Sequence, residues 1–281
     1  MRTIAHLSDL HFGRVDQTVI EPLIQTIKEL DPHALVVSGD LTQRARSHEF
    51  QEAREFLDEL PSPQIIVPGN HDVPLYNVFA RFFQPLDKYK RYITNDLEPF
   101  FADEEIAILG INTARSLTIK DGRVNEVQAA KIRERLCAYG DEITKIVVTH
   151  HPFELPEGHD RDELVNRAEM AMEALAACGA DVLLAGHLHV SHTGQTFTRY
   201  KIAGHNALVI SAGTATSTRG RGETNSFNVL RIKHPNIAVE RLSWQPARSV
   251  FAVASTEHFQ HTPHGWERVP DEAAADIIYE A

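Results

Sequence analysis

The chain has 281 residues, of which 42% are hydrophobic and 24% charged, and this is the composition of an ordinary globular protein. Its formal net charge of −11 is a poor match for duplex DNA, because binding that polyanion requires several phosphates to be neutralised. No apolar run approaches the roughly 18 residues of a membrane span, and the N-terminus turns polar within a few residues. We therefore expect a cytoplasmic protein that does not bind a membrane.

Short apolar runs alternate with amphipathic segments through the first two thirds of the chain. The apolar runs predict strands buried on both faces, at 4–8, 34–38, 64–68, 106–111, 145–149 and 181–185. Apolar residues recur at helical spacing within 20–27, 50–60 and 164–175. Strands that alternate with helices predict an α/β fold.

The last third of the chain shows a different pattern. Five candidate strands, and no long helical pattern, follow at 193–200, 207–212, 227–233, 237–244 and 249–253. We expect a β-rich C-terminal layer over 192–256, with a tail at 257–281. Because no segment resembles a linker, residues 1–256 are predicted to form one domain.

Two further features concern aromatic residues and cysteines. Eight of the nineteen Phe and Tyr residues lie between positions 76 and 101, which predicts a helical aromatic insertion. This insertion either packs on its own aromatics or forms a wall of a substrate pocket. The only cysteines, Cys137 and Cys178, are outside any CxxC motif, so we expect two separate buried small residues in helical stretches.

Residues suited to metal binding follow five of the predicted strands. They are Asp9-Leu10-His11, Gly39-Asp40, Gly69-Asn70-His71-Asp72, His150-His151-Pro152 and Gly186-His187-Leu188-His189. Ligands of open α/β sheets bind beyond the carboxyl ends of the strands, so we expect the five segments to converge. A purely structural role is disfavoured, because burying unpaired charges costs several kcal/mol per ion.

The donor types indicate which ions would bind. Imidazole, carboxylate and amide donors without cysteine suit Mn or Fe, and also Zn or Co, whereas Mg and Ca prefer oxygen donors alone. Seven ligands are too many for one ion. They suit two divalent ions that share one carboxylate, at the ~3.5–4 Å separation of two-metal hydrolytic sites.

In their order, these motifs resemble the signature of the calcineurin-like metallophosphoesterases, D-x-H, G-D, G-N-H-D, H and G-H-x-H. The resemblance implies a four-layer α/β/β/α sandwich with a dinuclear site at the C-terminal ends of the strands. It implies that Asp9, His11, Asp40 and His189 bind one metal, and that Asp40, Asn70, His150 and His187 bind the other. Asp40 would then bridge the two ions, and His151 would pack beside them.

The resemblance also implies catalytic and substrate-binding residues. His71 matches the family histidine that contacts the phosphate or protonates the leaving oxygen. Asp72 is expected either to orient an imidazole by accepting its N–H or to have a structural role. Arg14, Arg219 and Arg221 are candidate phosphate contacts, and solvated surface arginines are the alternative.

Departures from two subfamilies narrow the expected substrate. Gln43 stands where purple acid phosphatases carry a tyrosine, and Val73-Pro74 departs from the protein serine/threonine phosphatases. The chain is more similar to bacterial class III cyclic-nucleotide and glycerophosphodiester phosphodiesterases, which implies a small anionic phosphodiester substrate. The alternatives are a DNA nuclease of the double-strand-break repair branch, a lipid pyrophosphatase and a non-enzymatic scaffold. Homodimerisation is left open.

Overall fold

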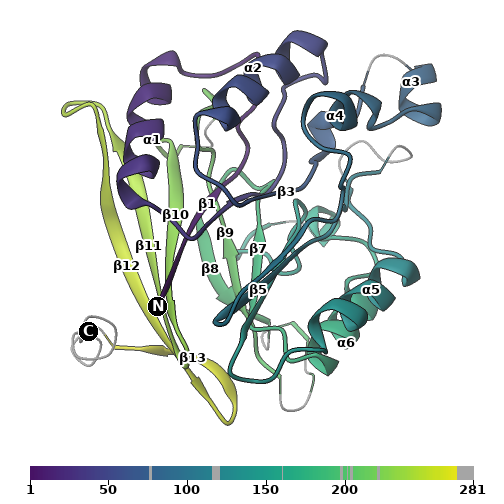
Figure 1. The fold of residues 1–281 in the computed structure, drawn as a ribbon, viewed down its shortest axis with the longest axis vertical. Coiled ribbons are helices and arrows are strands. Elements are labelled where there is room, and N and C mark those ends of the chain that lie inside the picture. Colours follow the sequence, from purple (N-terminus) through teal and green to yellow (C-terminus); the bar gives the residue numbers. More distant parts are fainter. Residues whose placement is uncertain are drawn as a thin grey trace.

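The computed structural model describes residues 1–75, 78–115, 121–159, 161–196, 199–200, 202, 205–219 and 222–270. Two sheets form its centre (Figure 1). In spatial order, the seven-stranded sheet contains β13 (Gly265–Val269), β12 (Val250–Thr262), β11 (Asn236–Gln245), β10 (Ser226–Lys233), β1 (Arg2–Leu7), β2 (Ala34–Val37) and β3 (Gln64–Ile66). The six-stranded sheet contains β4 (Phe100–Ala102), β5 (Ile106–Gly110), β6 (Thr144–Val148), β7 (Val182–Ala185), β9 (Leu208–Ser211) and β8 (His192–Gln195).

Helices cover the outer faces of both sheets (Figure 1). Residues of α1 (Gln17–Leu30) and α2 (Ser47–Asp58) share a core with the seven-stranded sheet, and residues of α5 (Glu126–Leu136) and α6 (Ala168–Ala177) share one with the six-stranded sheet. A third core joins the two sheets. The predicted four-layer α/β/β/α sandwich is therefore confirmed. No described helix combines the length and the apolar character that crossing a membrane requires.

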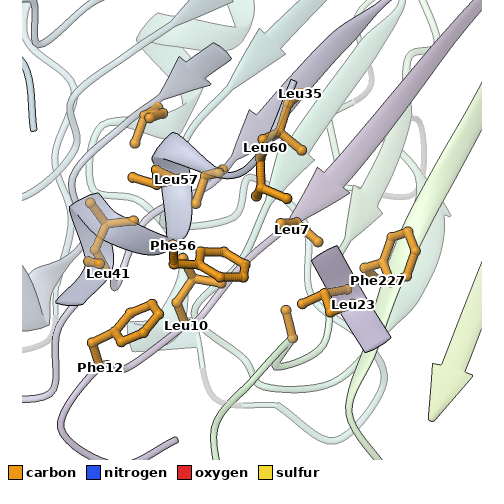
Figure 2. Packing of buried hydrophobic residues seen from close by; sticks show 14 of the residues in the cluster. Leu7, Leu10, Phe12, Leu23, Leu35, Leu41, Phe56, Leu57, Leu60 and Phe227 are labelled. Carbon is orange, nitrogen blue, oxygen red and sulfur yellow. The ribbon is translucent and has the colours of Figure 1, made fainter. Parts of the chain in front are cut away.

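The central strands read as continuous apolar runs because both of their faces are buried. On β1, Ala5 and Leu7 pack toward α1, whereas Ile4 faces the other sheet. Figure 2 shows Leu7 beside Leu23 of α1 and Phe227 of β10. The six strands predicted before residue 186 are all present, although α5 and β4 were not predicted.

The C-terminal third does not form a layer of its own. β8 and β9 join the six-stranded sheet, and β10 to β13 extend the seven-stranded sheet beyond β1. The expected boundary at residue 256 falls within β12, and the expected tail is wrong as far as Val269. Sequence periodicity missed this hairpin because only its inner face is apolar, with Phe259 and Trp266 buried between the sheets.

The aromatic insertion contains two short helices, α3 (Val78–Phe83) and α4 (Asp87–Tyr92), in agreement with the helical structure predicted for it. Tyr89 of α4 is fully buried against Phe50 of α2, with ring centroids 6.5 Å apart. In contrast, Phe79 and Phe83 of α3 are 67% and 73% exposed. The insertion thus packs partly on α2 and partly exposes its aromatics, and Tyr76 lies outside the described residues.

The cysteines are not separate residues, and this expectation is wrong. A disulfide joins Cys137, at the end of α5, to Cys178, at the end of α6, with Cα atoms 4.4 Å apart. The two helices pack against each other on the outer face of the six-stranded sheet. The two cysteines are 41 residues apart in the sequence, and this separation does not indicate that they meet. Their proximity follows from the packing of the two helices alone.

Candidate metal centre

The seven predicted ligands all lie just beyond the C-terminal ends of strands. Asp9 and His11 follow β1, and Asp40 and Asn70 follow β2 and β3 of the same sheet. The other three, His150, His187 and His189, follow β6 and β7 of the facing sheet. The packing of the two sheets brings both sets together, as the distances below show.

The first donor group consists of Asp9, His11, Asp40 and His189, whose ligand atoms all lie within 4.8 Å of one another. Asp9 Oδ1 is 3.6 Å from His11 Nε2 and 3.5 Å from His189 Nε2. Both Asp9 Oδ1 and His11 Nε2 are buried without a hydrogen-bond partner. Donors about 2.0–2.2 Å from a shared ion lie roughly 3 to 4 Å apart, so this group fits a metal ion.

The second donor group surrounds Asn70. Its Oδ1 lies 3.0 Å from His150 Nε2 and 3.2 Å from His187 Nδ1. Asp40 faces both groups, because its Oδ1 is 3.4 Å from His150 Nε2 while its Oδ2 is 3.7 Å from His11 Nε2. One carboxylate between two donor groups is the geometry that a bridging ligand requires.

His151 is also part of the second group. Its ligand atom lies within 4.8 Å of those of His150 and His187, and its Nδ1 is 2.8 Å from Thr113 Oγ1. The sequence assigned His151 to packing beside the site and did not identify Thr113. No motif marks Thr113, because only the pairing of β5 with β6 places it there.

The backbone of the candidate ligands adopts an uncommon conformation. Of the nine described non-glycine residues with positive φ, five are predicted ligands: Asp9, His11, Asp40, His187 and His189. Such conformations cost of order 1 kcal/mol or more each, and they concentrate at functional sites. The strand ends are therefore shaped to direct these side chains at the cost of local stability.

Two glycines of the motifs are required by close packing. A Cβ atom on Gly69 would lie 2.1 Å from Asp40 Oδ1, and one on Gly186 would lie 1.8 Å from Ser8 Oγ. A larger residue at either position would displace a loop that carries candidate ligands. The glycines of the G-N-H-D and G-H-x-H motifs thus allow loops from different strands to approach each other.

The protonation of the residues in the two donor groups suits the binding of cations. Burial lowers the pKa of His187 and of His189 to about 4, so both imidazoles are neutral at neutral pH and have a nitrogen lone pair for a metal. Burial acts in the same direction on His150, but the charges of Asp40 and Asp9 outweigh it and raise that pKa to about 9. The charges of Asp40 and Asp9 thus favour a cation at this place, as a divalent metal ion would be.

His71 lies beside the first donor group. Its ring is edge-on to His11, with centroids 4.9 Å apart, and its Nδ1 is 2.8 Å from the carbonyl oxygen of Gln43. Because a carbonyl only accepts, Nδ1 carries a proton and donates it to that bond. The other nitrogen, Nε2, is 3.1 Å from Arg219 Nη1. His71 and Arg219 thus form a pair next to the donor groups.

The contacts of Asp72 match the structural role and not the orientation of an imidazole. Its carboxylate accepts from the backbone N–H groups of Leu41 (3.2 Å), Thr42 (2.9 Å) and Gly69 (2.9 Å), and from no imidazole among the described residues. The 3₁₀ turn Asn70–Asp72 directs this side chain back toward the loop after β2. Asp72 therefore holds the loops after β2 and β3 together, and the carbonyl of Gln43 orients His71 instead.

Of the other two candidate arginines, the structure describes Arg14. Arg14 is exposed, and its described hydrogen bonds involve its backbone: its N–H donates to the carbonyl of His11 at 2.9 Å, and its carbonyl accepts from the N–H of Thr218 at 3.1 Å. Arg221 lies outside the described residues. The structure thus places one of the three candidate arginines, Arg219, beside the donor groups.

Comparisons with known proteins agree with this architecture. A family model described as calcineurin-like phosphoesterase matches residues 2–191. The glycerophosphodiester phosphodiesterase GpdQ of Enterobacter lignolyticus is 27% identical over 54% of this chain and 58% of its own length. The 3′,5′-cyclic adenosine monophosphate phosphodiesterase CpdA of Escherichia coli is 27% identical over 62% of this chain and 59% of its own. The chain thus spans under two thirds of these curated relatives.

A solved structure shows the same fold. A dimetal phosphatase from Danio rerio superposes with a TM-score of 0.63 at 13% identity, covering 90% of this chain and 98% of that one. At this identity the likeness concerns the arrangement of strands and helices.

Proposed function

The chain belongs to the calcineurin-like phosphoesterase family, and from this premise we propose that it hydrolyses small phosphodiesters with two divalent metal ions. One observation carries the proposal. Asp40 extends one carboxylate oxygen toward each of two donor groups, and buried Asp9 Oδ1 and His11 Nε2 beside it have no hydrogen-bond partner. Such a buried cluster is costly unless cations occupy it.

The proposed ligands are those that the motifs suggested. Asp9, His11, Asp40 and His189 would hold one ion, and Asp40, Asn70, His150 and His187 would hold the other. The mixed nitrogen and oxygen donors favour Mn or Fe, with Zn or Co as alternatives. When bound, such ions neutralise the charge of the phosphoryl group and supply an activated water.

The residues around the ions complete the proposed mechanism. The guanidinium of Arg219 would bind a phosphoryl oxygen, since its planar donors match phosphate geometry. His71 Nε2, held toward the same space by the bond from Nδ1 to Gln43, would contact the phosphate, or would protonate the leaving oxygen after taking up a proton in place of its contact with Arg219.

The proposed substrates are 3′,5′-cyclic nucleotides or glycerophosphodiesters. The names of the relatives support this class, as does the net charge of −11, which disfavours a polyanionic substrate. A nuclease is the second candidate, because the opening motif resembles that branch. The complete ligand set disfavours a non-enzymatic scaffold.

The test is a comparison of substrates with Mn-reconstituted protein. We expect faster hydrolysis of bis-p-nitrophenyl phosphate than of p-nitrophenyl phosphate, and turnover of 3′,5′-cAMP or a glycerophosphodiester but not of linear DNA. Protein from which metal has been removed with a chelator serves as the control. Preference for the monoester would contradict the phosphodiesterase proposal, and cleavage of DNA alone would select the nuclease.

A further inference from the structure

A cavity of about 550 Å³ lies beside β8, the edge strand of the six-stranded sheet. We call it the edge cavity, and it is lined by Ser191, His192, Thr193, Arg241, Ser255, Thr256, Glu257 and Arg268. They come from the segment at β8 and from β11, β12 and β13 of the facing sheet. None of them is a candidate metal ligand.

The edge cavity exists because the seven-stranded sheet extends past the edge of its partner. On β11, Ile237 and Val239 belong to the core between the sheets, and Arg241 is the next residue in the same alternation. Ser255 of β12 pairs directly with Arg241. The inner face of this sheet therefore changes from apolar to charged where the opposite sheet ends.

Arg241 forms no ion pair with a carboxylate of the described residues, and its Nε is buried without a hydrogen-bond partner. The acidic residue of the same cavity, Glu257, is paired with Arg268 at 3.2 Å. A buried Nε without an acceptor is costly, which favours an anion as the partner of this guanidinium.

We propose that the edge cavity is a second ligand site, which binds the phosphate group of a small molecule. The planar guanidinium of Arg241 would donate two parallel hydrogen bonds to phosphate oxygens, as arginine commonly does. The hydroxyls of Ser255 and Thr193 supply further donors within the same cavity. The volume lies within the roughly 300–1,000 Å³ range of small-molecule sites, so it has room for a sugar or glycerol attached to the phosphate.

This site is independent of the metal centre, and its test uses full-length protein treated with a chelator. Binding of inorganic phosphate and of adenosine 5′-monophosphate is followed by ³¹P NMR titration. We expect saturable binding of both, and roughly tenfold or greater weakening in Arg241→Gln, because hydrogen bonds to charged groups are lost. Arg241→Lys should weaken binding less, since it keeps the charge.

A matched variant controls for location. Arg248→Gln, in the turn between β11 and β12 outside the cavity, should bind phosphate as the unchanged protein does. Circular dichroism verifies that each variant is folded. Phosphate binding is also measured for Arg268→Gln, which changes the exposed wall of the cavity. Equal binding by the Arg241→Gln protein, or acetate binding as tightly as phosphate, would overturn the proposal.

Discussion

Among single residues, Asp40 has the broadest predicted effect because it faces both donor groups. Asp40→Ala should lower the bound metal from two ions per chain toward none. We expect kcat/KM for a diester to fall at least 100-fold, since losing even an outer partner of a ligand costs about 10–100-fold. Metal analysis and steady-state kinetics measure the two effects. Asp58→Ala, at an exposed carboxylate, is the control, and an active Asp40→Ala protein would refute the bridge.

His71 should act on the reaction and not on metal binding. His71→Ala is expected to keep both ions and to lower kcat about 10²- to 10⁴-fold, most strongly for substrates with poor leaving groups. A series of phenyl phosphodiesters of differing leaving-group pKa measures this dependence. An equal loss across the series would exclude a role as general acid and leave only a phosphate contact.

For Asp72 the structure predicts an effect on stability. Asp72→Ala leaves the backbone N–H groups of Leu41, Thr42 and Gly69 without their buried acceptor. At about 1–3 kcal/mol for each unsatisfied group, we expect the free energy of unfolding to fall by roughly 3 kcal/mol or more. Urea denaturation tests this, and an unchanged midpoint would show that the carboxylate does not join the loops.

At the scale of elements, the Cys137–Cys178 disulfide ties the end of α5 to the end of α6. It closes a segment of 41 residues, so it should stabilise the protein by about 2–4 kcal/mol. Reductant should lower the free energy of unfolding by that amount, and the double variant Cys137→Ser/Cys178→Ser should match the reduced protein. Two free thiols in the untreated protein would contradict the pairing.

At the scale of the whole molecule, each donor group combines ligands from both sheets. Metal binding should therefore stabilise the entire sandwich, by about 2.7 kcal/mol at a free metal concentration 100 times Kd. Thermal unfolding with Mn and after chelation measures this difference. The Asp40→Ala protein should not respond to Mn, and an equal response from it would place the stabilising ion elsewhere.

The sequence by itself determined the six apolar strands that carry or flank the motifs, the order of the motifs and the seven candidate ligands. These follow from local patterns: apolar runs mark strands buried on both faces, and donor residues directly after them must lie at one end of a sheet. The same local patterns placed Asp72 within the site, although two of its backbone partners, Leu41 and Thr42, belong to another loop. They also missed β13 and the continuation of β12, whose outer face is polar.

Only the tertiary structure decided which distant residues meet. The approach of α5 to α6 joins Cys137 to Cys178, and the pairing of β5 with β6 places Thr113 against His151. The extension of one sheet beyond the other leaves Arg241 facing a cavity. Such contacts depend on how elements pack in space, because neighbours in the folded chain are set by burial of shared apolar surfaces and not by their separation along the sequence.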